Sequence, residues 1–169
     1  MFFGDRLILG IISDTHVGDR SKEIPNKVYE HFSDVDLIIH CGDITSESVL
    51  DDLKKISKTL AVKGNGDYLD LPRERVINIG GFNLGIIHGD IIEPRGDLLK
   101  MKYYAMEKNL DILISGHTHI PLIKEITINE NKKILLLNPG SPTVPRGSIK
   151  TIMKVKIKDN SIEPVLIPL

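Results

Sequence analysis

Five short polar segments in this chain each follow an apolar run, and their residue types are those that bind divalent metal ions. They are Asp14-Thr15-His16, Gly42-Asp43, Gly64-Asn65-Gly66-Asp67, His88-Gly89-Asp90 and Gly116-His117-Thr118-His119. Imidazole, carboxylate and amide groups bind such ions through nitrogen and oxygen. Each segment alone has an ordinary structural explanation, because Asp-Thr can cap a helix and Gly-Asp and Asn-Gly are common turns. Together the segments hold four of the six histidines, and this concentration predicts a two-metal site.

The spacing within the segments supports the same prediction. Asp14 and His16 are two positions apart just after an apolar run, so both side chains can point in one direction. His117 and His119 repeat this spacing and can face two adjacent ions. A carboxylate has two oxygens and can bridge two cations, which makes Asp43 the candidate bridging ligand. The predicted metal ligands are Asp14, His16, Asp43, Asn65, His88, His117 and His119.

The remaining two histidines and the single cysteine have structural explanations. His31 falls within a predicted helix and is expected at the surface. His40 lies inside a predicted strand, where it is expected to support Asp43 from behind. Cys41 has no cysteine partner and is expected to be an inert packing residue.

The first half of the chain predicts the strands that position these segments. Arg6–Ile12 and Val35–Cys41 are short, branched and apolar, which is typical of strands buried on both faces. A helix is expected to begin near Pro25, a second follows Asp43, and Leu60–Lys63 supplies a third strand. This alternation predicts parallel strands, whose carboxyl ends meet at one edge of the sheet, where such folds place their sites.

The second half changes to hairpins. Gly80-Gly81 between two apolar runs, Arg75–Ile79 and Phe82–His88, predicts a two-residue turn. Asp97 caps a predicted third helix, and the buried strand Asp111–Ser115 follows. In that helix, Leu99, Tyr103, Met106 and Leu110 recur at helical spacing. Antiparallel strands are then expected at Ile120–Ile128, Lys133–Leu137, Ser148–Lys158 and Ile162–Ile167. This order predicts an α/β sandwich of two packed mixed β-sheets flanked by helices.

Size and composition limit the function classes. The 169 residues predict a single domain over 1–169, long enough to bury roughly 70% of its unfolded surface. With 22 basic and 23 acidic residues, the chain lacks the basic excess expected of a nucleic-acid or anionic-membrane partner, so neither is expected. The longest candidate for a signal core, Leu7–Ile12, is too short to span a bilayer. With the single Cys41, this predicts a cytoplasmic protein. A homo-oligomer stays open.

Taken in order, the five segments resemble the calcineurin-like metallophosphoesterases over nearly the whole chain. The small size and the turn Asn138-Pro139-Gly140-Ser141 are similar to the single-domain archaeal and bacterial phosphodiesterases. The resemblance implies two divalent metal ions, with Mn²⁺ favoured and Ni²⁺, Zn²⁺ or Fe²⁺ as alternatives. It implies that one ion is held by Asp14, His16, Asp43 and His119, and the other by Asp43, Asn65, His88 and His117.

The charges of such a site indicate its chemistry. Two divalent ions carry four positive charges, and Asp14 and Asp43 return two negative ones, so the site attracts phosphate. A hydroxide bridging the two ions is then the expected nucleophile at neutral pH. No catalytic serine or cysteine is needed, and none is assigned. The sequence predicts a metal-dependent phosphodiesterase acting on a small-molecule phosphoester.

Two positions depart from the frequent pattern of the family. Gly66 stands where many members carry a histidine that protonates the leaving group. Loss of a general acid typically costs about 10²–10⁴-fold, so activity is expected to favour leaving groups that need little protonation. Asp90 replaces the later histidine of a frequent His-Gly-His, and it either lowers the charge of the site or orients a ligand.

A second resemblance supplies an alternative function. The stretch Val76–Ser141 is similar to the phosphoesterase-fold subunit of the eukaryotic retromer coat, notably at Arg95-Gly96-Asp97 and Asp111–Ser115. This similarity implies a protein-binding scaffold with little or no turnover. Asn65 separates the two hypotheses, because that subunit lacks this ligand and the present chain retains it. A nucleic-acid-binding module is a third hypothesis, disfavoured by the charge.

Overall fold

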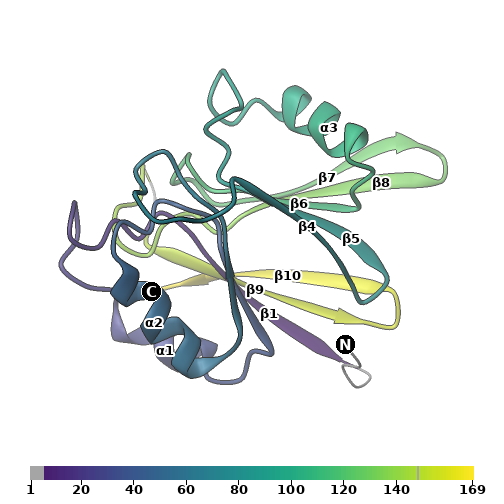
Figure 1. Ribbon diagram of the computed structural model, residues 1–169. Coiled ribbons are helices and arrows are strands. Elements are labelled where there is room, and N and C mark those ends of the chain that lie inside the picture. Colours follow the sequence, from purple (N-terminus) through teal and green to yellow (C-terminus); the bar gives the residue numbers. More distant parts are fainter. Residues whose placement is uncertain (1–5, 148) are drawn as a thin grey trace.

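A computed structural model describes residues 6–147 and 149–169, which form two packed five-stranded sheets (Figure 1). The first sheet has the order β10-β9-β1-β2-β3. Its strands β1, β2 and β3 are parallel, whereas β9 pairs antiparallel with both β1 and β10. Their bounds are β1 Leu7–Ile12, β2 Leu37–His40, β3 Thr59–Ala61, β9 Thr151–Lys158 and β10 Ser161–Pro168.

The second sheet has the order β4-β5-β6-β8-β7. Strands β5, β6 and β8 are parallel, and the hairpins β4–β5 and β7–β8 add an antiparallel strand at each edge. The bounds are β4 Glu74–Ile79, β5 Phe82–Ile87, β6 Ile112–Ile114, β7 Leu122–Asn129 and β8 Lys132–Asn138. The predicted pair of mixed sheets is therefore confirmed.

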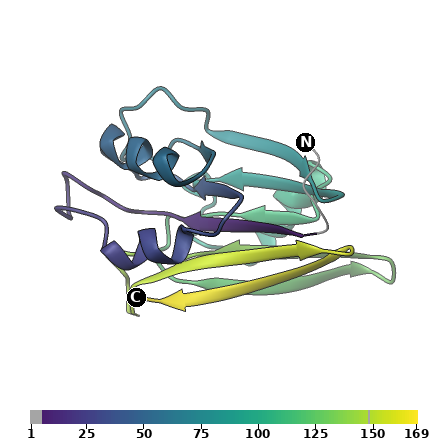
Figure 2. The same ribbon diagram turned by 90° about the horizontal axis from the view of Figure 1, so that it is seen from below.

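Within residues 6–147 and 149–169, three helices flank the sheets on their outer sides. Helices α1 (Asn26–Phe32) and α2 (Glu47–Ile56) pack on the first sheet, and α3 (Leu98–Glu107) packs on the second (Figure 1). Figure 2 shows β9 and β10 without a helix over their outer side. Apolar side chains fill three layers: one between the sheets and one under each set of helices.

Two glycines allow the helical layers to approach the sheets closely. A Cβ at Gly10 in β1 would lie 3.0 Å from the Phe32 ring of α1, and one at Gly85 in β5 would overlap the Leu110 side chain. Larger residues at either position would push the helical layer away from its sheet. Central strands with small residues thus set the thickness of both outer layers.

The predicted elements are confirmed, with small differences at their ends. Asp97 caps α3, and its side chain accepts a hydrogen bond from the Lys100 N–H at 2.9 Å. The strand predicted from Ser148 begins at Thr151, and Ser148 itself lies outside the described residues. Of the four apolar residues at helical spacing in and after α3, only Leu110 is buried, because the helix turns Met101 and Ala105 toward the sheet. Leu99, Tyr103 and Met106 are exposed.

The parallel strands of both sheets end at the same edge of the sandwich (Figure 1). The five polar segments follow β1, β2, β3, β5 and β6 in turn, each within a few residues of the strand's end. Both sheets therefore deliver polar side chains to one place, as the sequence predicts. Among the described residues, no helix has the length and apolar character needed to cross a membrane.

Candidate metal centre

The turns at this edge hold their side chains on a left-handed backbone. Asp14, His16, Asp43, His117 and His119 all have positive φ, between 46° and 66°. Residues with a Cβ are uncommon there, and such strain costs of order 1–3 kcal/mol each unless the surroundings hold it. Five of the seven predicted ligands therefore have the backbone strain that is typical of functional sites.

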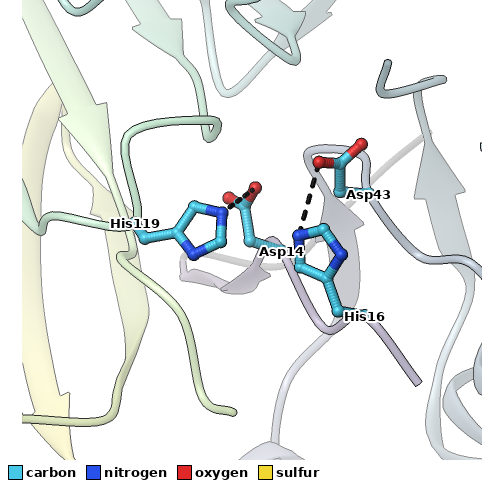
Figure 3. A group of neighbouring side chains, drawn as sticks. All are labelled: Asp14, His16, Asp43 and His119. Carbon is cyan, nitrogen blue, oxygen red and sulfur yellow. Dashed lines mark ion pairs between the residues drawn. The ribbon is translucent and has the colours of Figure 1, made fainter. Parts of the chain in front are cut away.

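Four of the predicted ligands form a first group, made of Asp14, His16, Asp43 and His119. They are all buried, and one candidate ligand atom from each lies within 4.8 Å of the others. His119 Nε2 is 3.2 Å from Asp14 Oδ1, and His16 Nε2 is 3.4 Å from Asp43 Oδ2. Figure 3 shows the four side chains pointing toward one another from three separate turns. The group could hold a metal ion.

Two atoms of the first group test whether a cation fits there. Asp14 Oδ1 and His16 Nε2 are buried and have no hydrogen-bond partner among the described residues. A buried polar atom without a partner is costly, and a cation between the two would satisfy both. Four ligands at about 2.1 Å from one ion stand about 3.4 Å apart in a tetrahedron. Two of the observed spacings, 3.2 and 3.4 Å, match that value, and all four ligand atoms lie within 4.8 Å of one another, so the residues fit a metal ion.

The other predicted ligands form a second group around His88, made of Asp43, Asn65, His88 and His117. His88 Nε2 lies 3.1 Å from Asn65 Oδ1, 3.2 Å from His117 Nδ1 and 3.4 Å from Asp43 Oδ2. These spacings also match those of ligands around one ion. Asp43 Oδ2 is 3.4 Å from both His16 Nε2 and His88 Nε2, so Asp43 belongs to both groups.

Backbone carbonyls fix which nitrogen of two histidines faces the centre. His119 Nδ1 lies 2.7 Å from the Val144 oxygen, and His88 Nδ1 lies 2.8 Å from the Cys41 oxygen. Because a carbonyl oxygen only accepts, both Nδ1 atoms carry the proton and donate it. The Nε2 lone pairs are thereby left to face a cation, an arrangement common among metal-binding histidines.

The electrostatics of the second group favour positive charge. Burial lowers the pKa of His88, but its contact with Asp43 and the charges of Asp14 and Asp43 raise it to about 9. Burial likewise raises the pKa of Asp43, yet the bond and charge of His88, together with the Gly66 N–H, hold it well below its usual range. The charged carboxylate and the cationic imidazole stabilise each other. A metal ion would therefore take the place of the proton on His88 Nε2.

The structure gives Asp67 a role that sequence reasoning missed. Its Oδ1 accepts hydrogen bonds from the N–H groups of Ile44 and Thr45, both at 2.8 Å, and its Oδ2 accepts one from Gly64 N–H at 2.8 Å. Asp67 therefore ties the turn of Asp43 to the turn that carries Asn65. The signal in the sequence is the acid two positions after Asn65, which reads as a further ligand or as a turn residue.

The turn after β8 supports the first group in a similar way. Ser141 Oγ donates to the backbone carbonyl oxygen of Asp14 at 2.8 Å, and Thr143 Oγ1 donates to the backbone carbonyl oxygen of Thr15 at 2.8 Å. On the other side, Asp14 Oδ2 accepts from Ser13 Oγ at 2.6 Å and from His117 N–H at 3.0 Å. The Asp14 turn is thus held by both sheets, and only Asp14 Oδ1 remains free for a ligand.

The two positions that depart from the family pattern lie beside the groups and belong to neither. Asp90 Oδ2 lies 3.4 Å from Nη1 of the exposed Arg73 and so forms an ion pair with it. Gly66 has no positive φ, and its N–H donates to Asp43 Oδ1 at 2.7 Å. A Cβ at Gly66 would lie 3.2 Å from that oxygen.

His31, which is not a predicted ligand, is half-buried in α1, whereas the sequence predicts it at the surface.

Comparison with known families gives a match over most of the chain. A family model described as the calcineurin-like phosphoesterase superfamily domain matches residues 7–160. A probable metallophosphoesterase of Methanocaldococcus jannaschii is 51% identical over 166 residues, which cover 98% of this chain and 83% of that protein.

Solved structures with the same fold include Vps29 and a phosphodiesterase. A single-substitution variant of Vps29 from Entamoeba histolytica has a TM-score of 0.81 at 27% identity, and covers 96% of this chain and 99% of its own. Wild-type Vps29 from the same organism, complexed with Zn²⁺, has a TM-score of 0.74 at 26% identity, covering 96% and 99%. An archaeal phosphodiesterase shares the fold, with a TM-score of 0.73, 22% identity and coverage of 95% and 100%.

Proposed function

The chain belongs to the calcineurin-like phosphoesterase superfamily, and from that premise we propose that it is a phosphodiesterase with two divalent metal ions. The observation that carries the proposal is the convergence of two groups of buried side chains on a shared carboxylate, that of Asp43. The partnerless atoms of Asp14 and His16 support the first ion, and the contacts of His88 Nε2 support the second.

The proposed ligand sets follow the two groups. Asp14, His16, Asp43 and His119 would hold one ion, and Asp43, Asn65, His88 and His117 the other. When bound, two divalent ions would lower the pKa of a water molecule and stabilise the negative charge that develops on the phosphoester.

We propose Mn²⁺ for both positions, which is the ion that the family resemblance favours. Ni²⁺, Zn²⁺ and Fe²⁺ are the alternatives, because every proposed ligand atom is nitrogen or oxygen and suits them as well. Cys41 is fully buried and burial raises the pKa of its thiol, so it supplies no thiolate. The Zn²⁺ complex of the similar Vps29 supports a divalent ion in this fold.

The chain's own residues would attract the substrate but would supply no side chain that protonates its leaving group. Burial lowers the pKa values of His16 and His117. The charges of Asp43 and Asp14 partly oppose this for His16, where Arg20 acts with burial, and the charges of His88 and Arg95 act with burial for His117. Arg95 is exposed, and its Nη1 lies 3.5 Å from the His117 backbone oxygen, so this cation beside the second group would draw a phosphoester toward the ions; Arg20 is also exposed, but it is paired with Asp19 at 3.3 Å. At Gly66 only a backbone N–H is present, and it already donates to Asp43. We therefore propose substrates whose leaving groups need little protonation.

Hydrolysis of bis-p-nitrophenyl phosphate tests this function. Protein stripped of metal should be inactive, and adding back divalent ions one type at a time should restore hydrolysis, most strongly with Mn²⁺. Two ions should remain bound per chain after saturation and desalting. Two bound ions without hydrolysis by any of the metals would contradict the phosphodiesterase and leave the fold and centre intact.

A protein-binding scaffold is the second candidate function, favoured by the likeness to Vps29 and by three exposed apolar residues. Ile91 and Ile120 follow the predicted ligands His88 and His119 closely in sequence, and Leu99 lies in α3; all three are more than half exposed. The hydrolysis test separates the two candidates, because a scaffold predicts bound metal without turnover. For either candidate, we propose a single domain in the cytoplasm, in keeping with the unpaired Cys41.

A further inference from the structure

His40 is a completely buried polar residue that belongs to neither group of proposed ligands. It ends β2, and its Nδ1 lies 3.2 Å from the Gly42 N–H. Its Nε2 lies 3.1 Å from the hydroxyl of Thr15, which is also completely buried. That hydroxyl lies 3.3 Å from the Ile44 oxygen. The three contacts form a continuous chain from Gly42 to Ile44.

The direction of each hydrogen bond follows from the groups at the two ends. A backbone N–H only donates, so His40 Nδ1 is the unprotonated acceptor of the Gly42 bond. A backbone carbonyl only accepts, so the Thr15 hydroxyl donates to Ile44. The Thr15 oxygen then accepts from His40 Nε2–H. Only the neutral Nε2–H tautomer satisfies all three bonds, and burial lowers the pKa of His40 to about 4, which keeps the ring neutral at pH 7.

This chain of bonds connects the two turns that carry most of the first group. Gly42 and Ile44 are the residues on either side of Asp43, and Thr15 stands between Asp14 and His16. All three flanked ligands have positive φ, so their turns need support from outside. The backbone bonds between the turns, such as Asp14 N–H to the Gly42 oxygen at 3.0 Å, align the strand ends. The bonds of His40 and Thr15 add a buried side-chain link between the same turns, beside the exterior bond from Thr45 Oγ1 to the Val17 backbone oxygen at 2.8 Å.

We propose that His40 and Thr15 act as one positioning unit, which holds the Asp14–His16 turn against the Asp43 turn and so sets the affinity of the first group for its ion. Neither residue touches the ion or the substrate; both act through the ligands beside them. The inference rests on the metal centre proposed above, and it is independent of hydrolysis. His119, the fourth ligand, is held separately by its bond to the Val144 oxygen.

Thr15→Val tests the unit, because it removes the hydroxyl and keeps the shape of the side chain. Metal affinity, measured by competition with a chromophoric chelator, should fall about 10–100-fold at the site of the first group, the usual cost of losing a residue that supports metal ligands. Thr15→Ser keeps the hydroxyl and should keep the affinity. Thr59→Val is the matched control, because the one hydrogen bond of Thr59 Oγ1 within the described part of the chain goes to the Ser57 backbone oxygen, between α2 and β3. Equal metal affinities in wild type and Thr15→Val would overturn this inference and leave the proposed metal centre intact. If wild type showed no saturable metal binding, both the inference and the metal centre would be overturned.

A double substitution tests whether the two residues act together. Asn at position 40 can still accept from the Gly42 N–H, but its shorter side chain does not reach Thr15. His40→Asn should therefore weaken metal binding, and adding Thr15→Val should weaken it little further, because the shared bond is already lost. Additive losses of affinity would overturn the unit. Unfolding midpoints of all variants, measured without metal, separate loss of affinity from loss of fold.

The ring nitrogens of His40 provide a readout without any metal. Nitrogen-detected NMR of the metal-free wild type at pH 7 should show His40 with a protonated Nε2 and an unprotonated Nδ1. Thr15→Val should shift the Nε2 signal, and Thr15→Ser should restore it. A protonated Nδ1 in the wild type would contradict the bond directions and overturn the inference.

Discussion

The two groups of proposed ligands differ in how well they are satisfied without a cation. The first group contains the carboxylates of Asp14 and Asp43 and leaves Asp14 Oδ1 and His16 Nε2 without hydrogen bonds. The second group shares Asp43, and its other members contact one another through His88 Nε2. A proton on His88 can complete the second group, whereas Asp14 Oδ1 and His16 Nε2 of the first group have no hydrogen-bond partner in the part of the chain that the structure describes. The first group should therefore bind its ion more tightly.

The two groups also differ in their support. Three ligands of the first group come from the turns after β1 and β2, which His40 and Thr15 connect. The second group is divided evenly between the sheets, with Asp43 and Asn65 from the first and His88 and His117 from the second. The distances between ligands of the second group therefore depend more on how the two sheets pack than do those of the first group. Negative charge and supporting hydrogen bonds are therefore concentrated on the same side of the centre.

Asp43→Ala should have the largest effect, because it removes the one ligand common to both groups. Hydrolysis should fall by at least about 10³-fold, since several kcal/mol of transition-state stabilisation depend on the ions. Elemental analysis should find neither ion retained, while circular dichroism should show the fold unchanged. Asp51→Ala, at an exposed position in α2, is the control. Retention of more than a few per cent of turnover would refute the shared role of Asp43.

Removing one ligand unique to each group tests the difference directly. Asp14→Ala takes a carboxylate from the first group, so one ion per chain should remain, against two in wild type, and the second group should hold it weakly. Asn65→Ala takes a neutral ligand from the second group, so one ion should again remain, and the first group should hold it tightly. Competition with a chelator that finds the ion of Asp14→Ala held more tightly than the ion of Asn65→Ala would invert the ranking of the two groups.

The proton on His88 makes the metal-free protein sensitive to pH. Because the folded pKa of about 9 lies above the unfolded value near 6.5, the protonated ring stabilises the fold most below pH 6.5, and this contribution is lost as pH rises through 9. Urea unfolding of metal-free protein should therefore show a loss of up to about 3 kcal/mol between pH 6.5 and 9.5. His40, with a pKa of about 4, titrates below this range. Metal-loaded protein should lack the loss, because the ion replaces the proton; a loss of equal size in both forms would contradict the assignment to His88.

Much of this centre can be predicted from the sequence, because parallel strands deliver their carboxyl ends to one edge. That rule brings together residues as distant as Asp14 and His119, and the structure places all seven predicted ligands in two touching groups. The structure leaves the ligand roles themselves as a proposal. The sheets, the hairpins and the cap at Asp97 follow from local patterns of apolar residues and turns.

The supporting residues could not be predicted, because their roles depend on distances between loops. Asp67 bonds to three backbone N–H groups on two turns, and nothing in its local sequence distinguishes this from metal binding. Thr15 reads as a spacer between two ligands until the ring of His40 is seen beside it. The face that α3 buries also escapes prediction, since apolar residues lie on both sides of it and the sheet selects Met101 and Ala105.

Gly66→His should have the smallest effect on the centre and a specific effect on its chemistry. The backbone at Gly66 needs no positive φ, so an L-residue fits its conformation. Its N–H would still donate to Asp43 Oδ1, and the new Cβ, 3.2 Å from that oxygen, requires a shift of only a few tenths of an ångström. Both ions should remain bound, and hydrolysis of the nitrophenyl ester should change little.

Wild-type rates should fall steeply across a series of aryl phosphodiesters as the leaving group becomes more basic. The variant should flatten this dependence, with a gain of up to about 10²-fold for the most basic member, because an imidazole can now protonate the departing oxygen. An unchanged slope with both ions bound would show that position 66 is not where the leaving group departs. Loss of one ion would instead show that the second group tolerates no side chain there.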